Sequence, residues 1–193
     1  MATPWYRAPE LILDTRHYTP AIDVWALGVL FGELIYLEPM FQGGKPEPNG
    51  VAKDQLLKIF GKLGVPSTES WPSLHDLPGW RHAGEWPELA GLPSSADATR
   101  LLREVLVGRL RACRQPSPAD CNNAVSALLA MLHLDPTRRV SCKDAKNLPF
   151  FSAFQPHLLR GNVLAEYSKA WQQVYPLRKE CRCKNCLNGV VVK

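Results

Sequence analysis

The chain has 193 residues, of which 46% are hydrophobic and 21% are charged. This composition is typical of a globular domain with enough apolar material for a core, and it excludes a chain that is disordered throughout. Lys and Arg outnumber Asp and Glu by 23 to 18, and the resulting net charge of +5 is spread along the sequence, which gives no reason to expect direct nucleic-acid binding.

The longest strongly apolar run covers residues 24–37 and is interrupted by Glu33. A membrane-spanning helix needs about 20 apolar residues, so we expect a buried helix here and no membrane contact. Residues 1–10 lack the basic start and apolar stretch of a secretory signal. The six cysteines are therefore expected to be thiols.

Three of these cysteines, Cys181, Cys183 and Cys186, lie close together in a basic tail. Such a cluster suggests zinc as one interpretation. Structural zinc sites use four ligands, and no fourth Cys or His lies nearby. This favours a structural tail and no metal site, although the role of the cluster stays open.

Prolines and hydroxyl residues mark the first helices. Pro4 and Pro9 favour extended or turning backbone before a short helix that starts near Pro9. Thr19 and Pro20 predict the start of a second helix, with Thr19 as N-cap and Pro20 in the first helical position. That helix is apolar on nearly every face and is predicted to end at residues 38–39, where Glu-Pro occurs.

Residues 43–50 are rich in Gly, Pro and Asn and predict a surface loop. Residues 54–63 have apolar side chains at amphipathic helical spacing and are expected to pack on the apolar helix. Residues 67–95 are dominated by Trp, Pro and Gly, and they contain WPSLHDLP at Trp71 and WPELAGLP at Trp86. Two such units are too few for a solenoid, so we interpret them as a local duplication that lengthens a loop.

Two more helix starts follow. Ser117 precedes a proline and stands three residues before Asp120, which predicts a third core helix. Ser141 and Asp144 repeat this pattern for a short helix that ends before Pro149. Phenylalanines 150, 151 and 154 are then expected to attach the following segment. Because no strand pattern is convincing, the predicted fold class is mainly α.

Sequence motifs occur in a recognisable order. Trp5, Tyr6 and Arg7 directly precede an Ala-Pro-Glu element formed by Ala8, Pro9 and Glu10; Asp23, Trp25 and Gly28 follow on the apolar helix, and Leu-Asp-Pro leads to Arg139. Together these motifs resemble the large lobe of a protein kinase, in which Ala-Pro-Glu follows the activation loop. The WYRAPE motif resembles the proline-directed group that includes cyclin-dependent kinases. RHYTPAIDVWALGVLFGEL and DQLLKIFGKLGVP are similar to Mediator-associated members, in particular the plant E-type.

The resemblance implies a specific part of the kinase fold: the C-terminal half of the large lobe, with the end of the activation segment and helices F to I, and without the small lobe. Residues 1–155 would form this partial kinase domain, and residues 156–193 a partly irregular C-terminal extension. One face of the apolar helix at 24–37 is then expected to lie uncovered.

Several residue roles are implied by the same resemblance. Glu10 would form a buried ion pair with Arg139, and Asp23 would accept hydrogen bonds from the backbone of the catalytic loop. Ala2, Thr3 and Arg7 would contribute to substrate recognition, with Arg7 beneath the pocket for the residue after the phosphorylated Ser or Thr. Ala2 and Pro4 depart from the residues that the family usually carries there, which leaves the shape of this pocket open.

The implied function is transfer of the ATP γ-phosphoryl group to Ser/Thr-Pro sites of protein substrates, in transcription regulation in the nucleus, with a C-type cyclin and the Mediator kinase module as partners. Mg and ATP are implied for the complete kinase. This chain has no GxGxxG, VAIK-like, HRD or DFG motif, so it should contain no catalytic residue and should be inactive alone. Two alternatives stay open: a non-catalytic interaction or decoy module, and a truncated gene model.

Overall fold

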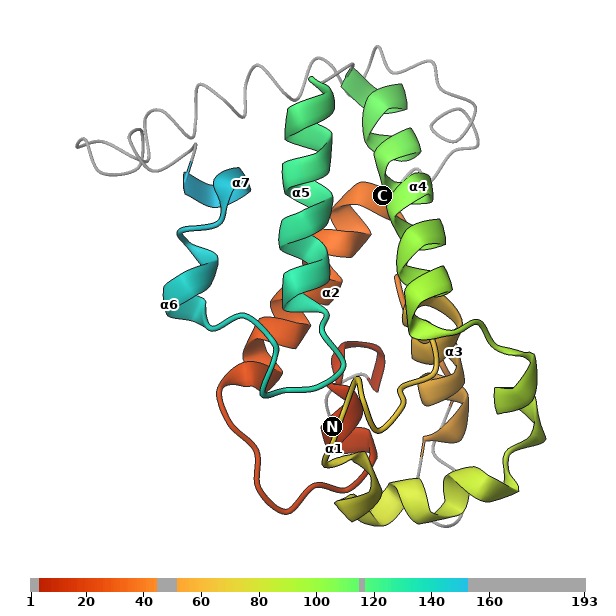
Figure 1. Cartoon of the computed structure of the whole chain (residues 1–193). Coiled ribbons are helices and arrows are strands. Elements are labelled where there is room, and N and C mark those ends of the chain that lie inside the picture. Colours follow the sequence, from red (N-terminus) through yellow and green to blue (C-terminus); the bar gives the residue numbers. More distant parts are fainter. Residues whose placement is uncertain (1–3, 45–51, 115–116, 153–193) are drawn as a thin grey trace, which may run out of the picture.

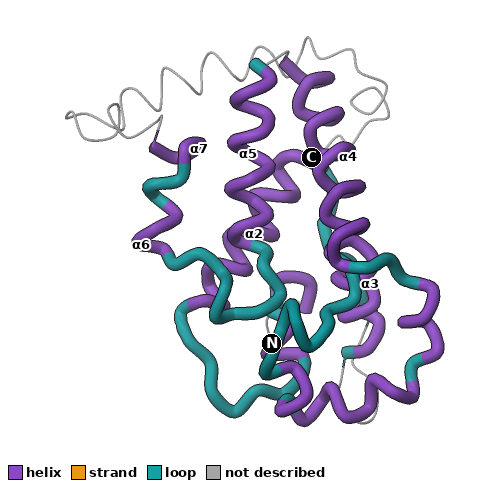
Figure 2. The backbone as a smooth tube through the Cα atoms, viewed as in Figure 1, coloured by secondary structure: helices purple, strands orange, loops and turns teal. Residues whose placement is uncertain are grey.

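The computed structural model describes residues 4–44, 52–114 and 117–152, and within these ranges the chain is helical without any strand (Figures 1 and 2). The mainly α class predicted from the sequence is therefore confirmed. A single isolated parallel bridge joins Val65 to Ser94 in this part of the chain. The α-helices and 3-10 helices (η) are, in chain order, η1 (Pro4–Tyr6), α1 (Pro9–Ile12), α2 (Ala21–Tyr36), α3 (Lys53–Leu63), η2 (Leu74–Asp76), η3 (Pro78–Glu85), η4 (Pro87–Gly91), α4 (Ser95–Arg114), α5 (Pro118–Met131), α6 (Cys142–Ala145) and α7 (Pro149–Ser152).

Helix α2 is the predicted apolar helix, with both ends shifted inward. It starts at Ala21 with Pro20 as N-cap, and proline has no side-chain acceptor to cap the helix. The Pro20 carbonyl accepts the N–H of Asp23 at 3.1 Å, and the Thr19 hydroxyl accepts the N–H of Ala21 at 3.4 Å. At the other end, Leu37 is left-handed (φ 58°) and donates its N–H to the carbonyl of Glu33 at 2.7 Å. The helix thus closes before Glu38-Pro39, since a residue that precedes proline avoids the helical conformation.

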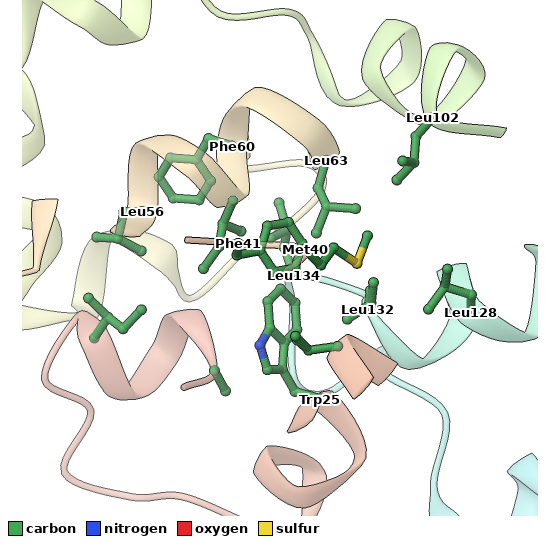
Figure 3. Close-up of a cluster of buried hydrophobic side chains, with 14 of the residues drawn as sticks. Trp25, Met40, Phe41, Leu56, Phe60, Leu63, Leu102, Leu128, Leu132 and Leu134 are labelled. Atoms are coloured by element: carbon green, nitrogen blue, oxygen red, sulfur yellow. The ribbon is translucent and has the colours of Figure 1, made fainter. Parts of the chain in front are cut away.

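The core forms where α2 packs on α5 and α4 (Figure 3). Gly28 allows a close approach between helices, because a Cβ placed there would lie 2.9 Å from the side chain of Leu132. Trp25 is fully buried and stacks on Phe41, with 5.9 Å between the ring centroids. The glycine and tryptophan of the sequence motif therefore serve helix packing.

Helix α3 packs mainly on α4 and α1. The prediction that this segment packs on the apolar helix is correct only near its C-terminal end, where the Lys62 ammonium lies 4.3 Å from the centroid of the Tyr36 ring of α2. The reason is the connecting chain: Met40 and Phe41 are buried and lie between the two helices (Figure 3). This chain supplies side chains to both sides of the core.

Helix α4 occupies a stretch to which the sequence analysis assigned no element. Ser94 accepts the N–H of Asp97 at 3.3 Å and donates its hydroxyl to the Asp97 carboxylate at 2.7 Å. Ala98, Leu102 and Leu106 are buried along one face. The missed start has the same Ser-x-x-Asp spacing as the two helix starts that were recognised.

Both recognised caps are present. Ser117 accepts the N–H of Asp120, and Ser141 accepts that of Asp144, each at 3.1 Å. The short α6 ends before Pro149 as predicted, and a further short helix, α7, starts at that proline. The rings of Phe150 and Phe151 in α7 lie 5.2 and 6.0 Å from that of Phe31 in α2, whereas Phe154 lies outside the described residues.

The duplicated Trp-Pro units have matching backbone structure. Leu74 donates its N–H to the carbonyl of Trp71, and Leu89 donates to that of Trp86, each at 3.1 Å. Trp71 and Trp86 are both buried. Each unit thus forms a 3-10 turn that inserts one tryptophan into the core. Among the described residues, no helix combines the length and apolar character needed to cross a membrane.

Candidate functional site

The WYRAPE segment runs from η1 into α1, and its first attachment is Trp5. The indole Nε1 donates to the carbonyl of Gly43 at 2.9 Å. Gly43 belongs to the connection between α2 and α3, so this bond joins parts of the chain that are 38 residues apart in sequence. The start of the segment is thereby fixed against the α2–α3 connection.

Gln55 of α3 makes the same junction from the other side. Its side chain is fully buried; the amide oxygen accepts the N–H of Gly43 at 3.0 Å, and the amide nitrogen donates to the carbonyls of Phe41 at 3.1 Å and Trp5 at 3.4 Å. A Cβ on Gly43 would lie within 2.8 Å of Gln55 backbone atoms. Only glycine fits this approach without displacing α3.

Tyr6 attaches the segment to α2. Its hydroxyl donates to the Glu33 carboxylate at 3.0 Å, and the second carboxylate oxygen of Glu33 accepts the N–H of Met40 at 3.3 Å. Partial burial, together with the hydrogen bond to Glu33, raises the pKa of Tyr6 above its ordinary value. Tyr6 therefore stays a hydrogen-bond donor at physiological pH.

Glu10 and Arg139 form a buried, bidentate ion pair. Arg139 Nη1 lies 2.7 Å from Glu10 Oε1, and Nη2 lies 2.9 Å from Oε2. The side chain of Arg139 is 0% exposed and that of Glu10 is 4% exposed. The pair joins residues that are 129 positions apart in sequence. The ion pair expected from the motifs is thus present in the structure.

The remaining donors of Arg139 are also satisfied. Nη1 donates to the carbonyl of Ala21 at 2.8 Å, Nη2 to that of Leu134 at 3.3 Å, and Nε to that of His133 at 3.0 Å. With the two bonds to Glu10, all the N–H donors of a guanidinium are used. The guanidinium carbon also lies 5.1 Å from the centroid of the Trp25 ring. Full pairing is what makes this charge tolerable in the core.

The loop that carries Arg139 is ordered by Asp135. Its Oδ1 accepts the N–H of Thr137 at 2.8 Å and the Thr137 hydroxyl at 2.7 Å. His133 lies beside it, and burial lowers the pKa of this imidazole despite the nearby Asp135. The Leu-Asp-Pro motif therefore acts by placing the arginine.

Arg7, the predicted substrate residue, is half-buried, and within the described ranges its side chain makes no hydrogen bond or ion pair. Its backbone N–H donates to the carbonyl of Pro4 at 3.1 Å. Ala8 and Pro9 are buried beside it. Ala2 and Thr3 lie outside the described residues, so the structure brings only Arg7 of the predicted set to this place.

Asp23 is exposed in the first turn of α2, and the described residues give it no hydrogen bond or ion pair. The chain contains no catalytic-loop motif whose backbone could donate to this carboxylate, so the hydrogen bonds that the kinase resemblance implies for Asp23 stay a prediction for the complete kinase. A carboxylate in the first turn is favoured by the helix dipole, which is the alternative explanation for an acidic residue at this position.

Sequence reasoning missed Gln55 and assigned no role to Glu33. Both are polar residues on helix faces that are otherwise apolar, and each places a hydrogen-bonding group beside the WYRAPE segment. A polar residue within an apolar helix stripe indicates that its side chain has a buried hydrogen-bond partner. Its partners cannot be deduced, because they are backbone atoms of distant segments.

The residues described here do not suit Mg-ATP. Within the described ranges, no group of three or more His, Cys, Asp or Glu side chains is placed to hold a metal ion. The chain also lacks the glycine-rich loop and the Lys, Asp and Asn motifs that bind nucleotide and metal in kinases. The three clustered cysteines lie outside the described residues.

Comparison with known proteins gives the class. Residues 1–151 match the family model of the protein kinase domain, so the chain belongs to the protein kinase family.

Its relatives narrow that class. Serine/threonine-protein kinase ssn3 of Neosartorya fischeri is 33% identical in an alignment of 193 positions, which covers 93% of this chain and 42% of the fungal protein. Cyclin-dependent kinase E-1 of Arabidopsis thaliana is 37% identical over 153 residues, which cover 78% of this chain and 29% of the plant protein. The similarity to cyclin-dependent kinases of the plant E-type is thus confirmed. The chain spans less than half the length of these curated relatives.

Proposed function

We propose that this chain is the substrate-side part of the large lobe of a cyclin-dependent-type serine/threonine kinase, with the partial kinase domain at residues 1–155. The complete kinase would transfer the ATP γ-phosphoryl group to Ser/Thr-Pro sites. The observation that carries the proposal is the WYRAPE segment, which is attached to α2, α3 and the Arg139 loop and leaves the Arg7 side chain without a partner.

Attachment at several points matters because substrate selection requires a fixed surface. Proline lacks an N–H group. A rigid pocket without an acceptor at the following position would therefore select proline by leaving the N–H of any other residue unpaired. Ala2, Thr3 and Arg7 are the residues we assign to this surface. From the same resemblance we propose a C-type cyclin and the Mediator kinase module as partners, and the nucleus as the location.

The proposal is tested with a chimera. The chain would be joined to the N-terminal part of Arabidopsis cyclin-dependent kinase E-1, co-expressed with a cyclin, and assayed on peptides that differ only in Ser-Pro against Ser-Ala. We expect phosphorylation with a preference for Ser-Pro, reduced by Arg7→Ala but not by Arg111→Ala, an exposed arginine on α4. A folded chimera that binds ATP and transfers nothing contradicts the proposal.

The second part of the test uses the chain alone. Because positioning and charge stabilisation provide nearly all the rate in phosphoryl transfer, a chain without the nucleotide motifs should give no phosphorylation and no Mg-ATP binding. Measurable transfer by the chain alone would place a nucleotide site in residues where we find none. A silent chain with an active chimera is the outcome that we expect.

A non-catalytic interaction module is the second candidate. It is favoured by an exposed leucine stripe on α2 and its C-cap residue, formed by Leu27, Leu30, Leu34 and Leu37, which are 52%, 47%, 74% and 59% exposed. Stripes of this kind mark surfaces that another protein segment covers. Failure of the chimera to transfer phosphate, with retained binding of Ser-Pro peptides by the chain alone, would favour this second candidate.

A further inference from the structure

A cavity of about 450 Å³ lies between the α1–α2 loop and the η2–η3 segment, and Arg7 is not among its lining residues. The lining residues are Thr15, Arg16, His17, Asp76, Leu77, Pro78 and Arg81. Its two walls are neighbours at the lower end of the molecule in Figure 1. The volume is within the range of about 300 to 1,000 Å³ that small-ligand sites occupy.

The walls are firmly joined. Gly79 donates its N–H to the carbonyl of Leu13 at 3.0 Å, and a Cβ on Gly79 would lie 2.8 Å from the Leu13 Cα. On the other wall, Thr15 donates its N–H to the carbonyl of Glu10 and its hydroxyl to that of His17, at 3.0 and 2.9 Å. The cavity is therefore built on fixed backbone, as a binding site requires.

Three of the seven lining residues have basic side chains. Arg16, His17 and Arg81 are exposed, and within the described residues neither arginine has an ion-pair partner. Asp76 is the one acidic side chain of the lining. Arg109 and Arg139, by contrast, are paired with carboxylates, so the two guanidinium groups at this cavity are available to a ligand.

The chemistry of the lining points to a phosphate monoester on a polypeptide. Arginine guanidinium groups bind phosphate oxygens in a bidentate manner. Leu77 and Pro78 are half-buried and give the cavity an apolar wall beside the basic groups. A polynucleotide would need a basic stripe along its backbone, which the dispersed charge of this chain does not provide. A phosphorylated side chain next to an apolar residue matches both parts of the cavity.

We propose that this cavity binds a phosphoserine or phosphothreonine side chain of a polypeptide, with Arg16 and Arg81 pairing with the phosphate. None of the lining residues belongs to the proposed Ser/Thr-Pro site. It requires no phosphoryl transfer by this chain, so it stands or falls independently of the proposed function.

The test is fluorescence anisotropy of a labelled phosphoserine-leucine peptide with the 193-residue chain, beside its unphosphorylated twin. We expect binding of the phosphorylated peptide alone, competed by inorganic phosphate. Arg16→Gln and Arg81→Gln should each weaken binding about three- to fivefold, the size of a partly exposed ion pair. Asp76→Asn should strengthen binding, because it removes a like charge. A gain of affinity cannot arise from misfolding.

The matched control is Arg111→Gln, which removes the same charge from an exposed position on α4. It should leave the affinity within the error of the parent chain. Equal binding of both peptides, equal losses in all three arginine variants, or tighter binding of a single-stranded oligonucleotide than of the phosphopeptide would overturn the proposal.

Discussion

Arg139 has the largest set of polar contacts among the described side chains, since each of its donors has a partner and one partner is a buried carboxylate. A buried pair of this kind contributes little net stability compared with an apolar replacement. Removing one member is different, because the other charge is left in the core. The effect of the Glu10–Arg139 pair can therefore be measured as a change in the free energy of unfolding.

Arg139→Ala should lower the free energy of unfolding by about 3 to 5 kcal/mol, because Glu10 would remain buried without its partner. Urea unfolding monitored by circular dichroism measures this. Arg138→Ala is the matched control: Arg138 is 51% exposed and lies 3.6 Å from Asp135, so its loss should cost less than about 1 kcal/mol. Similar costs for the two variants would show that the buried pair does not stabilise the fold.

Gln55→Leu keeps the approximate size of the side chain but removes its hydrogen-bonding groups. The N–H of Gly43 and the carbonyl of Phe41 would lose the partner that they have now, at a cost of about 1 to 3 kcal/mol. Hydrogen exchange should also become faster at the Gly43 amide. Gln42→Leu, at an exposed neighbouring position, should change neither quantity; an unchanged Gly43 amide in Gln55→Leu would refute this role.

His133 makes stability depend on pH. Burial lowers its pKa from the ordinary value of 6.5, so the unfolded state binds a proton more readily than the folded state. Its contribution is therefore fully present above about pH 6.5 and is lost as pH falls through the lowered pKa of the folded state. His133→Gln should remove this part of the pH dependence. Urea midpoints of the two proteins between about pH 7.5 and 5.5 should diverge toward acid; parallel curves contradict the assignment.

At the scale of elements, helices could be predicted from the sequence where their capping residues were recognised. The Ser-x-x-Asp pattern located α5 and α6, but the same pattern at Ser94 was overlooked because it follows a stretch rich in Trp, Pro and Gly. Local capping chemistry was sufficient information for α4. By contrast, the packing of α3 could not be deduced, because it depends on Met40 and Phe41 of the preceding connection, whose burial is a tertiary property.

The candidate site divides in the same way. The resemblance to protein kinases implied the Glu10–Arg139 pair, and the structure contains it. The motifs did not predict the contacts of Gln55, whose partners are backbone carbonyls and an N–H group of any residue type. The hydrogen bonds implied for Asp23 stay a prediction, because their donors belong to a catalytic loop whose motif this sequence does not contain.

Ser94→Ala should destabilise α4 by about 1 kcal/mol, the usual cost of losing a side-chain cap. The effect should concentrate in the first turn, where the Asp97 N–H loses its acceptor, and hydrogen exchange at that amide measures it. Ser73→Ala serves as control, since Ser73 precedes η2 without a side-chain cap bond. Equal effects of the two substitutions would mean that the Ser94 bond does not contribute.

At the scale of the whole molecule, the packed core and the exposed leucines lie on opposite faces of α2. Trp25, Gly28 and Val29 are buried, whereas Leu27, Leu30 and Leu34 are about half exposed or more. One uncovered face on this helix was expected from the sequence, and the structure contains it. Since the chain spans 42% of the fungal relative, further kinase sequence would cover the stripe under the first proposal, and a partner protein would cover it under the second.

The stripe makes a prediction about the chain by itself. Exposed contiguous apolar side chains bind the dye ANS, so the folded chain should enhance its fluorescence, and the double substitution Leu30→Lys with Leu34→Lys should reduce the enhancement. Because both positions are exposed, each lysine should change the free energy of unfolding by less than about 0.5 kcal/mol. Leu101→Lys is the control: this leucine is 49% exposed on α4 and lies outside the stripe. If Leu101→Lys lowered dye binding as much as the double variant, the apolar surface that binds the dye would be dispersed over the molecule. The leucine stripe of α2 would then not be the surface that the rest of a kinase covers.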